Sequence, residues 1–302
     1  MKSTLPKKIT IHEVVLRDGI QNEKKIVSTE QKLKLINDLI DCGIQRIEVS
    51  SFVNPRLVPQ MVDAEELWSR IVRKKGVVYT ALILNERGLD RAMRCKVPHV
   101  GIYVSASETH SRKNSNMSVA GAVKEARLLI DKAHGAGMEV RAGVMNAFGC
   151  AYEGKVPAGK VVKLVRDFIK REPDEICLAD TSGMANPVQV KNLVNRLRDI
   201  IGAVSVSLHL HNTRGLGLAN VWAALNEGVY IFDTSLGGLG GCPFIVGARG
   251  NIATEDTVNM LHETGVKTGI NLDKLIEASL RFEHYMEQAF PATVSHLTVC
   301  RD

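Results

Sequence analysis

The feature that most constrains this 302-residue sequence is a repeated alternation of short apolar segments with longer amphipathic ones. Eight segments rich in β-branched residues recur along the chain, and helical periodicity fills most of the intervals between them. The segments are Ile9–Leu16, Arg46–Ser50, Val77–Leu84, His99–Ser105, Glu139–Met145, Glu175–Ala179, Val204–His209 and Ile231–Thr234. Apolar strands that alternate with helices indicate a parallel sheet whose strands are buried on both faces.

The expected helices have clear end signals. The clearest are Thr29–Cys42, Asp63–Lys74, Val119–Ala136, Gly159–Arg171 and Pro187–Ile200. Several end on a glycine, which readily adopts the left-handed conformation at a helix C-terminus; Gly43 and Gly76 are examples. Eight strand–helix repeats in a chain of this length fit a closed (β/α)8 TIM barrel better than an open sheet.

A dinucleotide-binding open sheet is the rival fold. It requires Gly-x-Gly-x-x-Gly in the first strand–helix turn, where this chain has Arg17-Asp18-Gly19-Ile20-Gln21-Asn22. Two later glycine-rich stretches lack the acidic residue that completes that pattern. We therefore expect an α/β fold and a single TIM-barrel domain over residues 1–302. Its C-terminal helical extension, from about 254 to 302, holds further helices at Thr254–Thr264 and Asn271–Met286.

Composition excludes several classes of protein. The formal net charge is +6, but the basic pairs are scattered and aromatic residues make up only 5%, so no nucleic-acid partner is expected. No apolar run approaches the ~18 residues that a membrane span needs, and no membrane partner is expected. The N-terminus lacks the apolar core of a signal peptide, and the six cysteines contain no CxxC pair. These features predict a cytoplasmic protein with reduced thiols.

The carboxyl ends of barrel strands meet at one face, where barrel enzymes carry their active sites. Chemically useful side chains follow several of the predicted strands: Arg17, Asp18, Glu48, Asp180, His209 and His211, with Asn251 in a loop beyond the eighth. The sequence therefore predicts an active site at this face.

The His209-Leu210-His211 segment is the sharpest local signal. Residues two apart on a strand point to the same face with Cα atoms ~6.5–7 Å apart, so two imidazoles can share a metal ion. The alternative is one histidine in the core and another capping a loop. Asp18 and Asn251 could add oxygen ligands, or could simply serve as turn residues. Two nitrogens and two oxygens favour Mg²⁺ or Mn²⁺, with zinc as a further option.

Two other features suggest catalytic chemistry. Arg17 and Glu48 follow neighbouring strands and form a candidate buried pair, or else an ordinary surface pair. A guanidinium beside a metal stabilises an oxyanion that forms during a reaction. Gly237–Phe244 is a glycine-rich stretch with one thiol, Cys242, which is either a proton donor over the site or an incidental residue in a connection.

Several separated motifs together resemble those of one enzyme family. They are Leu16–Glu23, Ile47-Glu48, Ser51–Val53, Val58–Met61, His209–His211, Gly238–Pro243 and Gly247–Asp256. In this order, from about Ile11 to Leu272, they resemble the 3-hydroxy-3-methylglutaryl-CoA lyase family. Related isopropylmalate and homocitrate synthases share Arg-Asp-Gly and His-x-His, but they have Gly-Glu-Arg where this chain has the Cys242 loop. The resemblance therefore favours a lyase over a Claisen-type synthase.

The resemblance implies a metal-dependent carbon–carbon lyase that acts on an acyl-CoA partner and forms a homodimer. The implied metal ligands are Asp18, His209, His211 and Asn251. The implied catalytic residues are Arg17, Asp18, Glu48, His209 and Cys242, and the implied substrate-binding residues include Arg17, Gln21 and Asp180. Lys113 and Asn114 lie in the stretch expected to meet the CoA moiety. Such an enzyme cleaves a 3-hydroxyacyl-CoA to acetyl-CoA and a ketoacid.

This chain also departs from the family pattern at two positions expected to bind substrate. Gly143 replaces a tyrosine, and Arg214 replaces the tyrosine that follows His-x-His-Asp-Thr. Losing one aromatic side chain predicts open space near the acyl group, and Arg214 adds a cation. We therefore hypothesise a related substrate, such as citramalyl-CoA or a bulkier 3-substituted homologue. The alternative is neutral drift in an ordinary lyase of the family.

Overall fold

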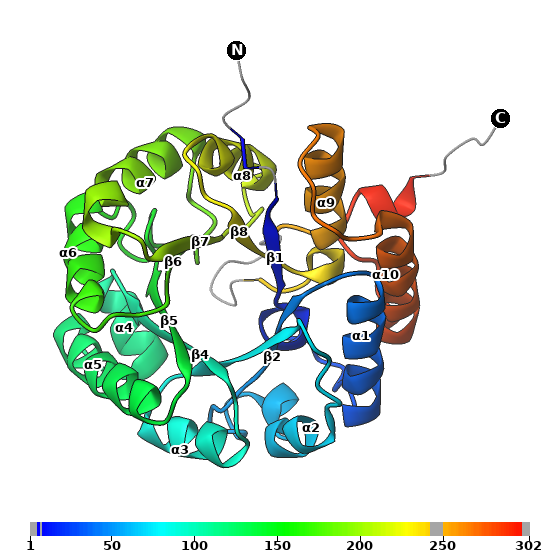
Figure 1. The fold of residues 1–302 in the computed structure, drawn as a ribbon, viewed down its shortest axis with the longest axis horizontal. Coiled ribbons are helices and arrows are strands. Elements are labelled where there is room, and N and C mark those ends of the chain that lie inside the picture. Colours follow the sequence, from blue (N-terminus) through cyan, green and yellow to red (C-terminus); the bar gives the residue numbers. More distant parts are fainter. Residues whose placement is uncertain (1–4, 7, 242–249, 298–302) are drawn as a thin grey trace.

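The structure is a computed structural model that describes residues 5–6, 8–241 and 250–297. Its eight strands form a closed barrel in sequential order, and every neighbouring pair is parallel (Figure 1). The strands are β1 Thr10–Glu13, β2 Arg46–Ser51, β3 Val78–Ile83, β4 His99–Ser105, β5 Glu139–Met145, β6 Glu175–Ala179, β7 Ser205–His209 and β8 Ile231–Thr234. The predicted (β/α)8 TIM barrel is confirmed.

The helices form a ring outside the barrel (Figure 1). They are α1 Thr29–Asp41, α2 Ala64–Arg70, α3 Glu86–Arg94, α4 Glu108–Ser115, α5 Val119–Gly135, α6 Ala158–Ile169, α7 Pro187–Ile201, α8 Gly217–Asn226, α9 Thr254–Glu263 and α10 Leu272–Met286. Ser28, Ser118 and Asn186 cap α1, α5 and α7, each accepting a backbone amide of the first turn. In the described part of the chain no helix is long and apolar enough to cross a membrane.

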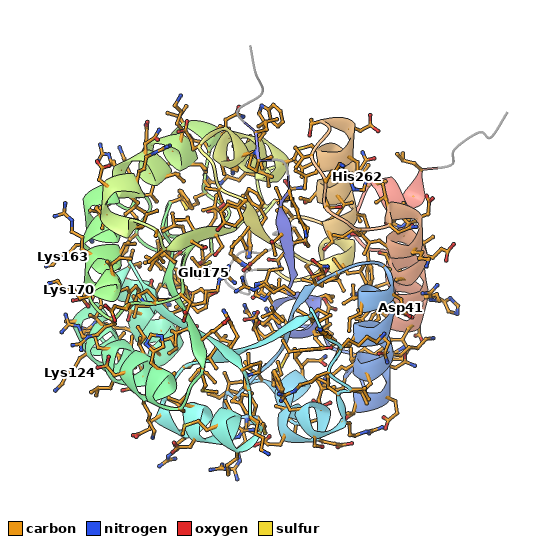
Figure 2. All side chains as sticks on the ribbon, in the orientation of Figure 1. Asp41, Lys124, Lys163, Lys170, Glu175 and His262 are labelled. Atoms are coloured by element: carbon orange, nitrogen blue, oxygen red, sulfur yellow. The ribbon has the colours of Figure 1, made fainter. Side chains whose placement is uncertain are left out.

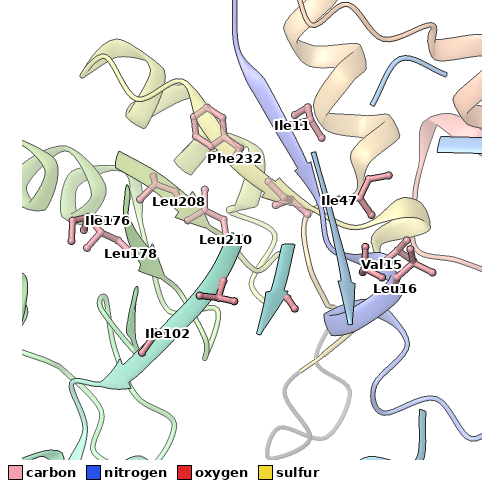
Figure 3. Close-up of a cluster of buried hydrophobic side chains, with 14 of the residues drawn as sticks. Ile11, Val15, Leu16, Ile47, Ile102, Ile176, Leu178, Leu208, Leu210 and Phe232 are labelled. Atoms are coloured by element: carbon pink, nitrogen blue, oxygen red, sulfur yellow. The ribbon is translucent and has the colours of Figure 1, made fainter. Parts of the chain in front are cut away.

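The strands alternate between two environments. Aliphatic side chains at alternate positions, such as Ile176, Leu178 and Leu208, lie in the apolar layer between barrel and helices (Figure 3). The intervening positions point into the barrel and are largely polar, with Glu175 inside while Lys163 and Lys170 point outward from α6 and the turn after it (Figure 2). The inner positions are therefore largely polar, with a few apolar residues such as Leu82 and Met145 near the mouth, whereas near-continuous apolar strands were expected from the sequence.

Buried ion pairs fill the barrel interior. The Arg141 guanidinium lies 2.7 Å from Asp233 Oδ1 and 2.7 Å from Glu175 Oε1. Arg46 Nη1 donates to Glu175 Oε2 at 2.5 Å, and His12 Nδ1 lies 3.0 Å from Asp233 Oδ1. These side chains are all buried, so the pairing offsets the cost of removing their charges from water.

The first strand ends earlier than the sequence predicted. β1 stops at Glu13, and Val15–Gly19 form a single π-helical turn. The Glu13 carboxyl group accepts the amides of Val15 and Leu236, both at 2.9 Å, which ties the start of the turn to the segment after β8. π-Turns occur frequently at functional sites, and this one carries Arg17 and Asp18 to the barrel mouth. The expected helix Asp63–Lys74 also ends early, at Arg70.

Candidate active site

Three side chains at the barrel mouth direct lone pairs toward one another. Asp18 comes from the π-turn after β1, His209 is the last residue of β7, and His211 lies two residues beyond it. The two Nε2 atoms are 3.0 Å apart, and Asp18 Oδ2 lies 3.8 Å from that of His209 and 3.9 Å from that of His211. Ligand atoms placed about 2.1 Å from a metal ion have similar separations. All three residues are buried, and the spacing fits a metal site.

Asn251 borders this cluster. Its Nδ2 donates to Asp18 Oδ2 at 2.8 Å and to the Leu239 carbonyl at 3.0 Å. Among the described residues, its buried Oδ1 has no hydrogen-bond partner. A buried amide oxygen without a partner is costly in a folded protein, and a cation would remove that cost. The residues present therefore fit a divalent ion bound by two nitrogens and two oxygens.

Neighbouring charges set the protonation of the cluster. Burial opposes ionisation of Asp18, but Arg17 and the two histidines lower its pKa to about 2. Burial and the adjacent His209 lower the pKa of His211 to about 4. At neutral pH, Asp18 is thus a carboxylate and His211 a neutral imidazole, which are the forms that bind metal.

A carboxylate on β8 binds the side of the His209 ring that faces away from Asp18 and His211. The Nδ1 atom of His209 lies 3.1 Å from Asp233 Oδ2, which leaves Nε2 facing Asp18 and His211. Burial lowers the pKa of His209, but the hydrogen bond to Asp233 and the charge of Asp18 raise it above its ordinary value overall. A carboxylate in this position orients a metal-binding imidazole and increases its basicity.

The Arg17 guanidinium lies beside the cluster and is fixed by two carboxylates. Its Nε donates to Glu48 Oε2 at 2.5 Å, and its Nη1 pairs with Asp18 Oδ1. Burial alone lowers the pKa of Arg17, but the charges of Glu48 and Asp18 raise it overall. The candidate pair of Arg17 and Glu48 is thus present and buried, and it gives a permanently charged donor in a defined orientation.

A cavity of about 330 Å³ opens above these residues. Arg17, Asp18, His209 and His211 line its inner end. A cavity with convergent polar groups and displaced pKa values is the usual form of an active site.

The other predicted site residues differ in their relation to this cavity. Gln21 lines it and donates to Asp18 Oδ1 at 3.2 Å. Asn114 on α4 lines it as well. Lys113, beside it, is exposed, with its Nζ 4.5 Å from the Tyr152 ring centroid. Cys242 lies outside the described residues.

Asp180 and Arg214 are not among the residues that line the cavity. The buried Asp180 accepts the amides of Met184 and Ala185 through Oδ1, and within the described chain its Oδ2 has no hydrogen-bond partner. Burial raises its pKa to about 7, although the positive charge of Arg214 acts in the opposite direction. Arg214 itself is exposed. These two residues lie beside the site.

The open space expected at Gly143 is absent. A Cβ atom built on Gly143 would lie 2.0 Å from Cδ1 and 2.1 Å from Cε1 of Tyr103, which faces it from the neighbouring strand β4. The Tyr103 ring thus occupies the volume that the missing side chain was expected to free. The prediction of free space was wrong because strand pairing was not available from the sequence.

Comparison with known proteins identifies the family. A model of the HMGL-like family matches residues 8–280, which is most of the chain. The chain belongs to the HMGL-like family. The resemblance stated from the sequence motifs is thereby confirmed.

Relatives in this family are similar over nearly their whole length. The chain is 42% identical to hydroxymethylglutaryl-CoA lyase YngG of Bacillus subtilis over 287 residues, covering 95% of this chain and 96% of the relative. It is 42% identical to the mitochondrial hydroxymethylglutaryl-CoA lyase of Homo sapiens over 275 residues, covering 91% and 85%.

Solved structures of HMGL-like proteins have the same fold. The Bacillus subtilis HMG-CoA lyase superimposes with a TM-score of 0.94 at 41% identity, covering 97% of this chain and 98% of that one. An HMG-CoA lyase of Acinetobacter baumannii, solved in complex with coenzyme A and 3-methylmalate, gives a TM-score of 0.94 at 40% identity, covering 100% and 98%.

The structure adds two residues that the motifs of this HMGL-like chain did not reveal. Asp233 orients His209, and Tyr103 forms part of the cavity wall. A carboxylate in the middle of the apolar segment Ile231–Thr234 was a usable signal for Asp233, because a buried charge needs a partner. Nothing in the sequence marks Tyr103, since its importance depends on the glycine opposite it on β5.

Proposed function

We propose that this chain is a metal-dependent carbon–carbon lyase that cleaves 3-hydroxy-3-methylglutaryl-CoA to acetyl-CoA and acetoacetate. The observation that carries the proposal is the convergence of Asp18, His209 and His211 beside the fixed Arg17 guanidinium, at the inner end of one cavity. The names of the relatives in the HMGL-like family support the same reaction. The bound coenzyme A and 3-methylmalate in the Acinetobacter structure support a CoA thioester and a small hydroxy acid as the ligand classes.

Asp18, His209, His211 and Asn251 would hold a divalent ion, with Mg²⁺ or Mn²⁺ favoured by the mixed nitrogen and oxygen donors and zinc as a further option. When bound, such an ion lowers the pKa of a substrate hydroxyl that coordinates it. The carboxylate form of Asp18 and the neutral form of His211 suit this role at neutral pH.

The chain's own side chains account for the remaining chemistry. Asp18 takes the proton of the 3-hydroxyl, or His209 takes it through Nε2 in place of binding the ion; the C2–C3 bond breaks, and its electron pair passes to the acetyl-CoA enolate as the ketone forms. Arg17 stabilises the enolate charge, and Glu48 keeps the guanidinium in place. Cys242 or a histidine then protonates the enolate carbon.

The other sequence-based assignments are supported to different degrees. Gln21 and Asn114 lie on the cavity wall, where they can contact the acyl group and the CoA moiety respectively. Lys113 adds a positive charge beside Asn114 that suits the phosphates of CoA. Asp180 and Arg214 lie in the loops that follow β6 and β7, outside the cavity wall. Their effect on substrate binding would be through the position of these loops.

We also infer a homodimer in the cytoplasm. The homodimer follows from the family resemblance, and light scattering tests it directly, since a monomer would contradict it. The cytoplasmic location follows from the composition of the sequence. It agrees with a rat relative named cytoplasmic, whereas other relatives are named mitochondrial.

Activity on the purified thioester tests the proposal. Acetyl-CoA and acetoacetate should form in equal amounts from 3-hydroxy-3-methylglutaryl-CoA with no added ketoacid. A Claisen-type synthase would instead require a ketoacid and would consume acetyl-CoA. His209→Ala should abolish turnover while leaving the circular dichroism spectrum unchanged. Failure of the wild-type enzyme to cleave the thioester, or full turnover in the folded His209→Ala variant, would contradict the proposal.

A further inference from the structure

The Tyr103 ring lies flat against two glycines of the barrel wall. A Cβ on Gly143 would come within 2.0 Å of the ring, and one on Gly101 would lie 2.8 Å from its Cε2. Real Cβ atoms do not approach other atoms this closely, so any larger residue at Gly143 would displace the ring. Neither glycine has a positive φ. The ring, and not the backbone conformation, therefore requires a glycine at these positions.

The same tyrosine faces the reaction site. Tyr103 lines the cavity together with Arg17, His209 and His211. Its side chain is half-buried, and within the described residues its hydroxyl has no hydrogen-bond partner. Burial raises its pKa well above the ordinary value, so the hydroxyl keeps its proton at neutral pH. It is thus free to donate to, or accept from, a molecule in the cavity.

We propose that Tyr103 determines substrate specificity by two separable means: its ring limits the size of the 3-substituent of the acyl group, and its hydroxyl hydrogen-bonds the acyl portion of the substrate. This inference deepens the proposed function and rests on it. The sequence led us to expect a larger acyl substituent, whereas this proposal expects a smaller one. The Tyr103 ring from β4 fills the volume left at Gly143. The wild-type enzyme should accordingly prefer a 3-methyl to a 3-ethyl substituent.

A pair of thioesters tests the role of the ring. We expect the ratio of kcat/KM for 3-hydroxy-3-ethylglutaryl-CoA to that for the 3-methyl compound to rise about tenfold in Tyr103→Ala, since one methylene in a tight pocket is worth roughly that factor. Tyr103→Leu, which keeps more apolar volume, should give a smaller rise and serves if the alanine variant does not fold. An unchanged ratio in both folded variants would overturn the role of the ring.

Tyr103→Phe is the matched variant for the hydroxyl. It keeps the ring and removes one hydrogen bond, so kcat/KM should fall about tenfold for both thioesters while their ratio stays constant. Mn²⁺ affinity should be unchanged, because no hydrogen bond joins Tyr103 to the proposed ligands in the described structure. Equal kcat/KM in wild type and Tyr103→Phe would refute the role of the hydroxyl.

A stability cycle tests the packing without any assay of activity. Gly143→Ala should lower Tm by about 5 °C in the wild-type background, because the new methyl collides with the ring. In the Tyr103→Ala background, the same change should have almost no effect. Equal shifts in the two backgrounds would show that the ring does not lie on Gly143. Absence of cleavage by the wild-type enzyme would instead reject the proposed function itself and leave this cycle unaffected.

Discussion

Two regions of this barrel bury charged side chains and use them in opposite ways. In the interior, Arg141 lies between Asp233 and Glu175, and Arg46 closes the other side of Glu175. At the mouth, the lone pairs of Asp18, His209 and His211 face one another beside a cavity. The interior charges face opposite charges, whereas the mouth brings together three groups that can bind a cation, beside the Arg17 guanidinium.

The difference shows which buried charges indicate function. Paired charges such as Arg141 and Asp233 add little net stability compared with apolar residues, but each is costly to leave without its partner. Ligand atoms that converge repel one another, and a bound ion would offset that repulsion. Asp233 belongs to both regions, because it pairs with Arg141 and also holds Nδ1 of His209.

The largest expected loss of activity follows a substitution at the barrel mouth. Arg17→Lys should lower kcat by roughly a thousandfold or more, because a lysine cannot reproduce the fork of donors that binds Glu48 and faces the cavity. Steady-state kinetics on 3-hydroxy-3-methylglutaryl-CoA measures this loss. The thermal unfolding midpoint should stay close to that of the wild type, since a positive charge remains beside Glu48 and Asp18. Turnover near the wild-type value would show that Arg17 is only structural.

Asp233→Asn tests the link between the two regions. It leaves Arg141 without one opposite charge, so we expect a loss of about 3 kcal/mol in the free energy of unfolding. It also weakens the hydrogen bond to His209 Nδ1. Mn²⁺ affinity should also fall about 10- to 100-fold. Urea denaturation and calorimetric titration measure the two effects.

Ser207→Ala is the matched control for that change. Ser207 Oγ accepts from Arg141 Nη2 at 2.8 Å, and no hydrogen bond between it and His209 occurs in the described structure. Its removal should cost about 1 kcal/mol of stability and leave Mn²⁺ affinity unchanged. Equal losses of affinity in the two variants would mean that Asp233 has no specific effect on the imidazole.

A smaller effect concerns a buried carboxyl group that has only neutral partners. Glu13 accepts two backbone amides and the Thr254 hydroxyl, and burial raises its pKa to about 8. The folded state therefore keeps a proton that the unfolded chain releases above pH ~4.3. The free energy of unfolding should fall as the pH rises from about 5 to 8.

Glu13→Gln should flatten this pH dependence. An amide oxygen can still accept the two backbone amides, and the amide nitrogen can donate to Thr254. Urea midpoints at pH 5 and pH 8 should thus differ less in the variant than in the wild type. An identical change of midpoint with pH in both proteins would assign the proton to another group.

The barrel could be predicted because each strand and each helix has its own pattern of apolar residues in a short stretch of sequence. The Arg17 and Glu48 pair and the cluster of Asp18, His209 and His211 could also be anticipated, since strand ends converge in such a fold. The π-turn could not, because the Glu13 carboxyl group at its start binds an amide 223 positions away.

The position of Tyr103 could not be predicted either, because it also depends on a contact between residues distant in the sequence. A glycine in a strand signals that something approaches closely, but the sequence does not say from which strand. Here the ring comes from β4 and reaches Gly143 on β5. The open space predicted from Gly143 is therefore filled from β4, and the preference for a larger substrate drawn from Gly143 and Arg214 stays a prediction.

The most direct test of the metal site at the mouth is calorimetric titration of exhaustively chelated enzyme with Mn²⁺ or Mg²⁺, with acetyl-CoA formation followed in parallel. We expect no turnover after chelation, binding of one ion per chain, and recovery of turnover in step with occupancy. His211→Ala should bind the ion at least about tenfold more weakly. Full activity after chelation, or undiminished binding in the folded His211→Ala protein, would contradict the assignment.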